Sequence, residues 1–306
     1  MKQEKAQTSG STPVGKGDEK DGEWHAGEVT LRHLEARGAA ETERMSTGEL
    51  RASYLCEGLA VEDSISLVYW DVDRAVIGAA LPVSKSLKLS APGALRADYF
   101  CERREIGIVN LGGSGSVAVD GEAHPLGKYD FVYAGRGSRE IVFEPGSGGE
   151  RPVYYMVSYP AHRTCGTARI PYAEAEGREL GATEGCNERS LHPMIAPAKV
   201  ESCQLVMGVT LIAGGSVWNT MPPHTHLRRS EIYFYFSIEE DSLVFHFMGR
   251  PSETRHLVVR DRQAVLSPSW SIHSGVGTAN YGFVWAMGGE NQEFSDMDGV
   301  DFSALR

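Results

Sequence analysis

Two histidines two positions apart, with a carboxylate five positions after the second, constrain this chain more than any other feature. Residues 222–236 read PPHTHLRRSEIYFYF and contain His224, His226 and Glu231. Alternate side chains of an extended segment point to the same face, so the two histidines share one face. Glu231 opens an aromatic and β-branched run that is typical of the next strand. The pattern predicts three ligands of a divalent-metal site, and the alternative is a polar turn with a solvated glutamate.

The length and the glycine content predict the fold class. The chain has 306 residues, which is enough for two ordinary domains or one large β fold. Hydrophobic residues make up 41% and charged residues 23%, as in globular proteins. Its 35 glycines lie among many short apolar runs, a pattern that favours turns and strands over long helices. We therefore expect an all-β protein with few short helices.

Net charge and cysteine usage narrow the functional classes. The formal net charge is −11 and no basic run is visible, whereas binding nucleic acid by neutralising phosphates needs a basic face. The five cysteines are scattered without a CxxC, which indicates reduced thiols in a cytoplasmic protein and no cysteine zinc site. No stretch approaches the 18 apolar residues of a membrane span, and the N-terminus lacks the apolar core of a signal peptide.

Composition divides the chain into four parts. Residues 1–27 are rich in Gly, Lys, Glu, Ser and Asp, and we expect a disordered leader there. Residues 28–160 start with helical spacing and continue as short strands with Gly-rich turns, which predicts an N-terminal barrel with short helices. Residues 161–199 have no clean period and suggest a connecting segment. Residues 200–306 form a second β series, which predicts a C-terminal barrel that carries the histidines.

The two β series look like one unit used twice. In the second series, the strands after Glu231 lead to PSWSIH, which runs from Pro268 to His273. Together with His224 and His226, these residues resemble the two-motif signature of the cupin superfamily, HxHxxxxE followed by PxGxxH, with a tryptophan where glycine is usual. The resemblance implies a bicupin, that is, two β-barrel domains of the jelly-roll type.

The first series keeps little of this signature. By spacing, Glu105 matches the carboxylate of the first motif, but the histidine positions fall on Asp98, Phe100 and Arg139. We therefore expect a degenerate N-terminal barrel that binds no metal and is kept for architecture.

Beyond the superfamily, the chain resembles the family of 4-deoxy-L-threo-5-hexosulose-uronate ketol-isomerases over residues 50–306, most clearly in WNTMPPHTHLRRSEIYFYF and SPSWSIHSGVGT. The resemblance implies one zinc ion per chain, bound by His224, His226, Glu231 and His273, and a homo-oligomer, namely a hexamer. It also implies a step of pectin and uronate breakdown. A linear 5-keto-4-deoxyuronate with an aldehyde at C1 becomes 3-deoxy-D-glycero-2,5-hexodiulosonate, a 2,5-diketo acid.

The chemistry that the resemblance implies directs attention to three further residues. Aldose–ketose interconversion moves hydrogen between neighbouring carbons without net redox change, which suits a redox-inert Lewis acid such as zinc. Glu253 is a candidate base, and Arg255 is a candidate clamp for the carboxylate of a small anionic sugar acid. A surface ion pair is the alternative for both. Strand parity places Tyr235 on the face of Glu231, either as a substrate contact or as barrel packing.

Two other functions fit the same residues. Three histidines and a carboxylate also suit iron, manganese or nickel, so the first alternative is another metal-dependent cupin enzyme, such as a dioxygenase or a different sugar isomerase. The second alternative is a non-catalytic bicupin that binds a sugar acid without converting it. The sequence alone leaves the metal, the general base and the assembly open.

Overall fold

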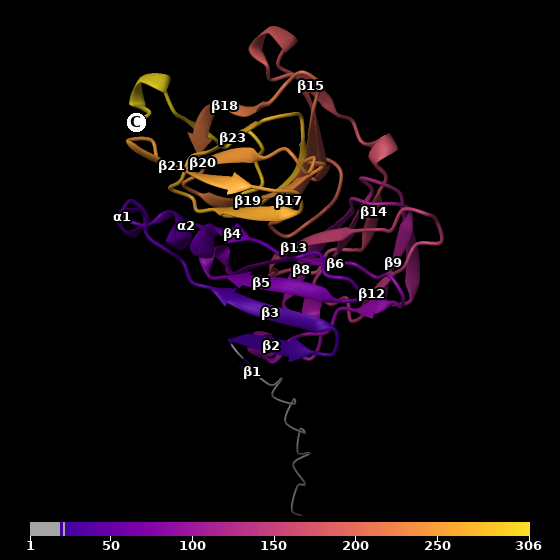
Figure 1. Ribbon diagram of the computed structural model, residues 1–306. Helices are drawn as coiled ribbons and strands as arrows, with labels where there is room; N and C mark the ends of the chain where they lie inside the picture. Colours follow the sequence, from indigo (N-terminus) through magenta and orange to yellow (C-terminus); the bar gives the residue numbers. More distant parts are fainter. Residues whose placement is uncertain (1–18, 21) are drawn as a thin grey trace, which may run out of the picture.

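The computed structural model describes residues 19–20 and 22–306. The strands of these residues form four sheets, with a larger and a smaller sheet in each half of the molecule. Figure 1 shows the two halves stacked, with the orange and yellow strands of the C-terminal half above the indigo and magenta strands of the N-terminal half. The all-β prediction with few short helices is confirmed.

The N-terminal barrel packs a nine-stranded sheet against a four-stranded one. The larger sheet has the order β1 (Glu19–Lys20), β2 (Glu23–Ala26), β3 (Val29–Leu34), β5 (Ile65–Trp70), β6 (Ala75–Ala80), β13 (Tyr154–Pro160), β8 (Arg104–Asn110), β11 (Phe131–Ala134) and β14 (Ala168–Ile170). The smaller sheet has the order β10 (Glu122–Leu126), β9 (Gly115–Val119), β12 (Ile141–Glu144) and β7 (Leu87–Lys88).

The C-terminal barrel packs a seven-stranded sheet against a five-stranded one. The larger sheet has the order β15 (Arg178–Leu180), β16 (Arg189–Ile195), β17 (Val206–Ile212), β24 (Gly282–Gly289), β19 (Arg229–Phe236), β22 (Gln263–Ser267) and β4 (Leu55–Cys56). The smaller sheet has the order β21 (Glu253–Val259), β20 (Val244–Arg250), β23 (His273–Gly277), β18 (Trp218–Thr225) and β25 (Asp298–Gly299).

Helices are short and lie outside the sheets. The two α-helices are α1 (Ala39–Thr42) and α2 (Thr47–Tyr54), and the 3-10 turns are Val72–Arg74, Gly93–Leu95, Phe100–Glu102, Tyr172–Glu174, Thr183–Gly185 and Phe302–Ala304. Helix α2 begins with a capping box, in which the Ser46 hydroxyl accepts from the Glu49 amide and the Glu49 carboxylate accepts from the Ser46 amide. No helix in the described part of the chain combines the length and the hydrophobicity needed to cross a membrane.

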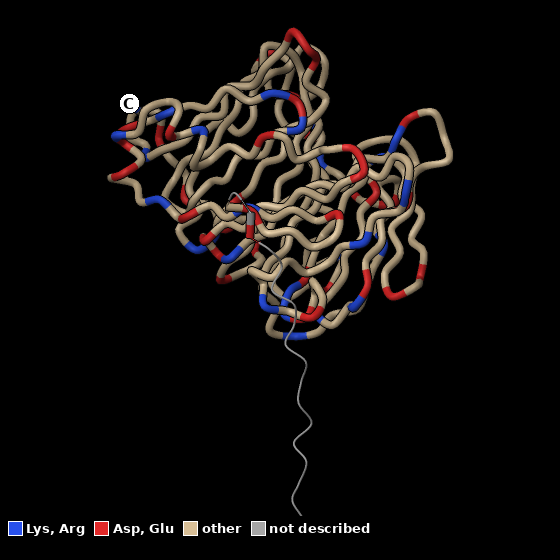
Figure 2. The backbone as a smooth tube through the Cα atoms, turned by 60° about the horizontal axis from the view of Figure 1, so that its bottom comes forward, with Lys and Arg blue, Asp and Glu red and all other residues tan. Residues whose placement is uncertain are grey.

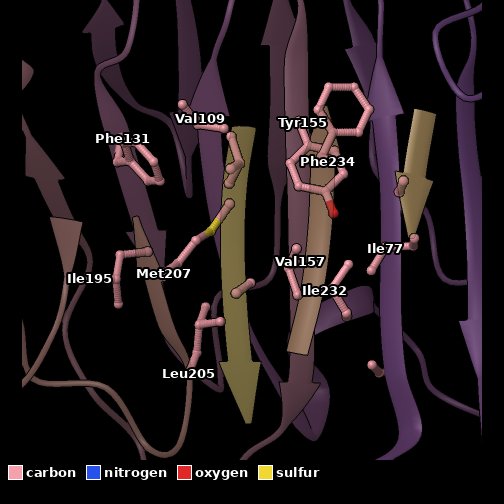
Figure 3. Close-up of a cluster of buried hydrophobic side chains, with 14 of the residues drawn as sticks. Ile77, Val109, Phe131, Tyr155, Val157, Ile195, Leu205, Met207, Ile232 and Phe234 are labelled. Atoms are coloured by element: carbon pink, nitrogen blue, oxygen red, sulfur yellow. The ribbon is translucent and has the colours of Figure 1, made fainter. Parts of the chain in front are cut away.

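Strand alternation divides the buried side chains of the central strands of the larger sheets between two cores. In β19, Tyr233 and Tyr235 point into the C-terminal barrel, whereas Ile232 and Phe234 point toward the other barrel. The outward faces of the two larger sheets therefore share a third core between the barrels. Figure 3 shows this core, with labelled side chains from both barrels directed toward one another: Ile77, Val109, Phe131, Tyr155, Val157, Ile195, Leu205, Met207, Ile232 and Phe234. The molecule is thus four sheets deep, with three apolar layers between the sheets.

The structure assigns several segments differently from the expected division of the chain. Residues 19–20 and 23–26 are paired strands at the end of the nine-stranded sheet, while residues 1–18 and 21 of the expected leader lie outside the described residues. Residues 161–199, expected to connect the barrels, supply β14 to one barrel and β15 and β16 to the other. Short strands with mixed polarity carry too weak an alternation to be recognised in the sequence.

An early segment also belongs to the later barrel. Strand β4 pairs with β22 at the edge of the seven-stranded sheet, although α2 and β4 precede every other strand of that barrel. Figure 1 shows α1, α2 and β4, in indigo, beside the orange strands. Such a pairing across the whole chain has no local signal in the sequence.

Glu105 does not occupy a ligand position of the first barrel. It shares a face of β8 with Gly107, whose Cβ would meet Ile195 and Met207 of the second barrel. The carboxylate of Glu105 is fully buried between the barrels and accepts hydrogen bonds from Tyr133 Oη (2.7 Å) and from the amides of residues 203–205 (2.6–2.9 Å). The match by spacing is therefore wrong, because an offset of one residue turns a side chain to the opposite face of a strand.

Candidate metal centre

Four predicted ligands converge inside the C-terminal barrel. His224 comes from β18, His226 from the turn after it, Glu231 from β19 and His273 from β23. His224 Nε2 lies 3.0 Å from His226 Nε2 and 2.9 Å from His273 Nε2. Glu231 Oε2 lies 2.9 Å from His226 Nε2 and 3.1 Å from His273 Nε2. All four side chains are buried, and these donor atoms lie within 4.8 Å of one another.

The protonation pattern around the four donor atoms fits a cation. His226 Nδ1 lies 2.8 Å from the carbonyl oxygen of Asp296, and donating its hydrogen there leaves Nε2 as a lone pair directed at the centre. His273 Nδ1 lies 3.3 Å from Ser267 Oγ, which supports the same tautomer. Lone pairs about 3 Å apart repel one another unless a cation lies between them, and ligands at zinc bond lengths of about 2.0–2.1 Å are separated by about 3 Å.

Burial controls the charge of the centre. Burial, and then the neighbouring His273, lower the pKa of His224 to about 3, so that imidazole is neutral. Burial alone would raise the pKa of Glu231, but the neighbouring imidazoles of His273 and His226 hold it well below its usual range. Three neutral imidazoles and one carboxylate would leave a divalent ion with a net positive charge, which attracts an anionic or electron-rich ligand.

A cavity of about 150 Å³ opens at the centre. One end of its wall is formed by His224, His226 and Glu231. The remainder is mostly apolar, with a few polar side chains: Leu180, Arg189, Leu191, Thr210, Asn219, Thr220, Tyr233, Phe283, Met287, Phe294 and Met297. At about 30 Å³ for each water molecule, the volume corresponds to about five waters and suits a small molecule.

Tyr233 brings a hydroxyl group to this wall, next along its strand face from the predicted ligand Glu231. Its ring centroid lies 5.5 Å from that of His273. Burial, reinforced by the charge of Glu231, raises the pKa of Tyr233 well above 10, so the hydroxyl keeps its proton. Tyr233 is therefore a fixed hydrogen-bond donor at the edge of the centre.

Three other predicted site residues are not brought to the cavity. Tyr235 points into the barrel as predicted, but its hydroxyl pairs with His246 Nδ1 at 2.7 Å and does not line the cavity. Glu253 is exposed and stands opposite Arg250 in the backbone register of the hairpin between β20 and β21. Strand β21 is the outer strand of its sheet, separated from β23 by β20, so a side chain at its start cannot reach the ligands.

Arg255 serves a helix end instead of a substrate. Its Nη1 donates to the carbonyl oxygens of Thr42 (3.0 Å) and Glu43 (3.2 Å), and its Nη2 donates to that of Met45 (2.6 Å). Carbonyl groups at the end of a helix lack partners within the helix, and a cation satisfies them well. The assignment of Arg255 as a carboxylate clamp is therefore corrected.

Two arginines of the motif, Arg228 and Arg229, bind the segment that carries Asp296. Arg228 makes a salt bridge with Asp296 and a second one with Asp298 (3.0 Å). Arg229 is buried, and its Nη2 donates to the carbonyl oxygen of Asp296 at 2.7 Å, the same atom that binds His226. Both arginines thus hold the C-terminal segment that orients His226.

Sequence reasoning missed four polar residues of the cavity, Asn219 and Thr220 on β18 and, farther from the motif, Arg189 and Thr210. Arg189 and Thr210 lie on β16 and β17, and β16 falls in the segment that we expected to be a connection. A reading of residues 189–195 as a strand would have placed Arg189 and Leu191 on one face.

Comparison with known proteins identifies relatives along nearly the whole chain. A profile of the KduI/IolB family matches residues 57–304. A protein of Lachnoclostridium phytofermentans named 4-deoxy-L-threo-5-hexosulose-uronate ketol-isomerase is 47% identical over 276 residues, which are 89% of this chain and 100% of the relative. A protein of Bacillus pumilus with the same name is 49% identical over 266 residues, which are 87% of this chain and 96% of the relative.

Solved structures share the fold at low identity. A crystal structure of an IolB-like protein from Salmonella typhimurium aligns with a TM-score of 0.61 and 14% identity, over 76% of this chain and 88% of that one. The oxalate decarboxylase of Lactobacillus farciminis, in its formate complex, aligns with a TM-score of 0.51 and 9% identity, over 73% of this chain and 79% of that one. These similarities support the predicted pair of cupin barrels.

Proposed function

The chain belongs to the KduI/IolB family, and from this membership and the metal centre we propose that it is a metal-dependent ketol-isomerase of a deoxy-keto uronate. The observation that carries the proposal is the length and level of the similarity, 47% identity over 89% of the chain, to a relative named for this activity. The proposed substrate is the linear 4-deoxy-L-threo-5-hexosulose-uronate, and the product is the 2,5-diketo acid.

The reaction is balanced within one molecule. The C1 aldehyde carbon gains a hydrogen and becomes a hydroxymethyl group, while C2 and its hydroxyl lose two hydrogens and become a ketone. One of these hydrogens moves to C1 and the other to O1, so no external oxidant or reductant is required. The protein has to bind the chain, hold its C1–C2 end in place and stabilise the oxygen that gains charge when the C2 proton leaves.

We propose zinc as the metal, held by His224, His226, Glu231 and His273. A divalent cation bound there supplies Lewis acidity, which makes a hydrogen next to a carbonyl more acidic. Tyr233, which keeps its proton, donates a hydrogen bond to a substrate oxygen in the cavity. The apolar side chains of Phe283, Met287 and Phe294 limit the water that surrounds the reacting carbons.

The test compares His273→Ala with the control His256→Ala, which changes an exposed histidine of the same barrel. We expect His273→Ala to lose bound metal and at least about 100-fold in turnover, because even the supporting partners of metal ligands are worth 10–100-fold. Elemental analysis, circular dichroism and an isomerase assay under nitrogen measure the metal, the fold and the activity. His256→Ala should match the wild type in all three.

Chelation gives an independent arm of the same test. Activity should fall when the metal is removed and return when zinc is added back. Full activity of His273→Ala, or of the thoroughly chelated protein, would overturn the metal mechanism. Turnover that needs oxygen would favour a dioxygenase instead.

A further inference from the structure

We infer that Arg189 and Thr210 form the carboxylate-binding end of the cavity and thereby select a sugar acid over a neutral sugar. The inference rests on the proposed function, since it states how the substrate is oriented in that same site. The carboxylate would lie at Arg189 and Thr210, and the carbonyl end would lie at the histidines.

Strand register places the two residues on the cavity face, away from the metal ligands. Thr210 pairs with Leu191 on one side and with Phe283 on the other, and residues paired in this way point to the same face. Glu231 pairs with Met287, four positions farther along β24 than Phe283. Four positions of a strand span about 13 Å of backbone. The cavity therefore extends from the ligands toward Thr210 and, beyond it, Arg189.

Both residues present buried polar atoms without partners. Thr210 is 0% exposed, and its hydroxyl makes no hydrogen bond to any group within residues 19–20 and 22–306. Arg189 Nε is likewise buried and unpartnered within these residues, while Nη1 donates to the carbonyl oxygen of Asn187 at 2.7 Å. The edge formed by Nε and Nη2 is therefore left for a ligand. Unpartnered buried donors are rare in proteins and call for an explanation.

The charge of Arg189 is also uncompensated. None of the described acidic side chains makes a salt bridge with it, and the cavity beside it is lined by Leu180, Leu191 and Phe283. Burial lowers the pKa of Arg189. A guanidinium stays protonated in proteins, so a positive charge faces a largely apolar space. The protein as a whole has a net charge of −11, so this local cation is what an anionic substrate requires.

The geometry of a guanidinium suits a carboxylate. Two parallel N–H donors along one edge match the two oxygens of a carboxylate, and a nearby hydroxyl adds a third hydrogen bond. A neutral sugar of the same length would leave Arg189 and Thr210 without partners in the complex, which makes its binding weaker. The pair therefore fixes both the class of substrate and its direction in the cavity.

The experiment combines protein variants with a change in the ligand. The variants are Arg189→Gln, Arg189→Lys and the isosteric Thr210→Val, and the control is Arg178→Gln, an exposed arginine on the neighbouring strand β15. Each is assayed with the uronate and with its methyl ester, which keeps the carbonyl end but lacks the charge. Calorimetry with gluconate and with sorbitol, two non-reacting six-carbon ligands, measures the preference for an acid without relying on activity.

We expect the wild type and Arg178→Gln to prefer the acid to the ester by about 100-fold in KM, the loss expected for a charge-assisted pair of hydrogen bonds. Arg189→Gln should abolish this ratio, mainly through KM, with unchanged metal content and a smaller effect on kcat. Arg189→Lys should keep part of the preference for the acid, because lysine keeps the positive charge but not the two parallel N–H donors. Thr210→Val should lower it by about 5- to 10-fold, the value of one hydrogen bond.

The outcomes separate the inference from the proposed function. An acid-to-ester ratio in Arg189→Gln equal to that of the wild type would overturn the inference while leaving the isomerase intact. If the wild type does not isomerise the uronate but binds gluconate over sorbitol in an Arg189-dependent way, the proposed function fails and the anion site stands. Should Arg189→Gln not fold, a ratio unchanged in both Thr210→Val and Arg189→Lys would overturn the inference as well.

Discussion

The hydroxyl of Tyr233 is a polar group of the cavity wall on the same strand face as the predicted ligand Glu231. It keeps its proton because burial and the charge of Glu231 raise its pKa well above 10. A neutral donor that is already in place stabilises the negative charge that develops on a substrate oxygen, because the protein need not rearrange during the reaction. Its position thus links the metal centre to the chemistry.

Replacing Tyr233 by phenylalanine tests this role at the residue scale. We expect kcat to fall by about 100-fold, the usual effect of removing one donor to a developing oxyanion, with metal content retained. The control is Tyr235→Phe, whose hydroxyl pairs with His246 and does not line the cavity. Steady-state kinetics with elemental analysis decide the matter, and equal losses in the two variants would contradict the role.

The residues of the site differ in how far the sequence predicts them. The four ligands follow from spacing, because strand alternation brings His224 and His226 together and the motif adds Glu231 and His273. Glu253 could not be excluded, because the sequence does not say which strand of a sheet is outermost. The orphan donors of Arg189 become visible only when the cavity and the hydrogen bonds are known.

At the scale of elements, a fully buried carboxylate, that of Glu105, links the two barrels. Glu105 of β8 accepts hydrogen bonds from the amides of Cys203, Gln204 and Leu205, which lead into β17 of the other barrel. These amides belong to a buried turn and would otherwise lack partners. Glu105 therefore fixes the direction in which the chain enters the C-terminal barrel.

We predict that Glu105→Gln destabilises the protein by about 3 kcal/mol. The amide nitrogen of glutamine cannot accept hydrogen bonds, so buried amides lose charged partners that are each worth about 1.5–3 kcal/mol. The matched control is Glu122→Gln, which removes an exposed carboxylate of the same barrel. Urea unfolding followed by circular dichroism measures both variants. If Glu105→Gln lowers the free energy of unfolding no more than the control does, Glu105 does not stabilise the junction of the two barrels.

Element boundaries are predictable where alternation is strong and not where it is weak. The run at residues 232–236, IYFYF, is β-branched or aromatic throughout, and it lies in β19 (Arg229–Phe236) as expected. The strands β15 and β16 carry arginine, glutamate, histidine and proline, and their pairing depends on neighbours far along the chain. The same reason explains why the division into domains at residue 161 differs from the sheets of the structure.

At the scale of the whole molecule, the barrels share a core, and we expect them to unfold as one unit. Tyr155 of one barrel stacks on Phe234 of the other with ring centroids 4.1 Å apart, and both lie in the layer of Figure 3. Acidic and basic residues are interspersed along the backbone seen in Figure 2, so contacts between opposite charges are spread over the surface. The homo-oligomer and the hexamer remain predictions from the resemblance, and the cytoplasmic location remains a prediction from the scattered cysteines.

We predict that Phe234→Ala destabilises both barrels together, by about 3–5 kcal/mol, the usual cost of removing a buried phenylalanine. Phe302→Ala, at a side chain that is 60% exposed, is the control. Hydrogen exchange measured by mass spectrometry follows β8 in one barrel and β24 in the other. Faster exchange in β24 alone would show that the barrels unfold independently.

The docking of α2 sets an order for events during synthesis. The guanidinium of Arg51 donates to the carbonyl oxygen of Val258, 207 positions later, and β4 completes the edge of the last sheet. During translation Arg51 leaves the ribosome long before Val258 is synthesised. Helix α2 therefore lacks the strands β21 and β22, on which it packs, until nearly the whole chain has emerged. Premature termination of translation would therefore leave a fragment with an unpaired, apolar end that chaperones and proteases recognise.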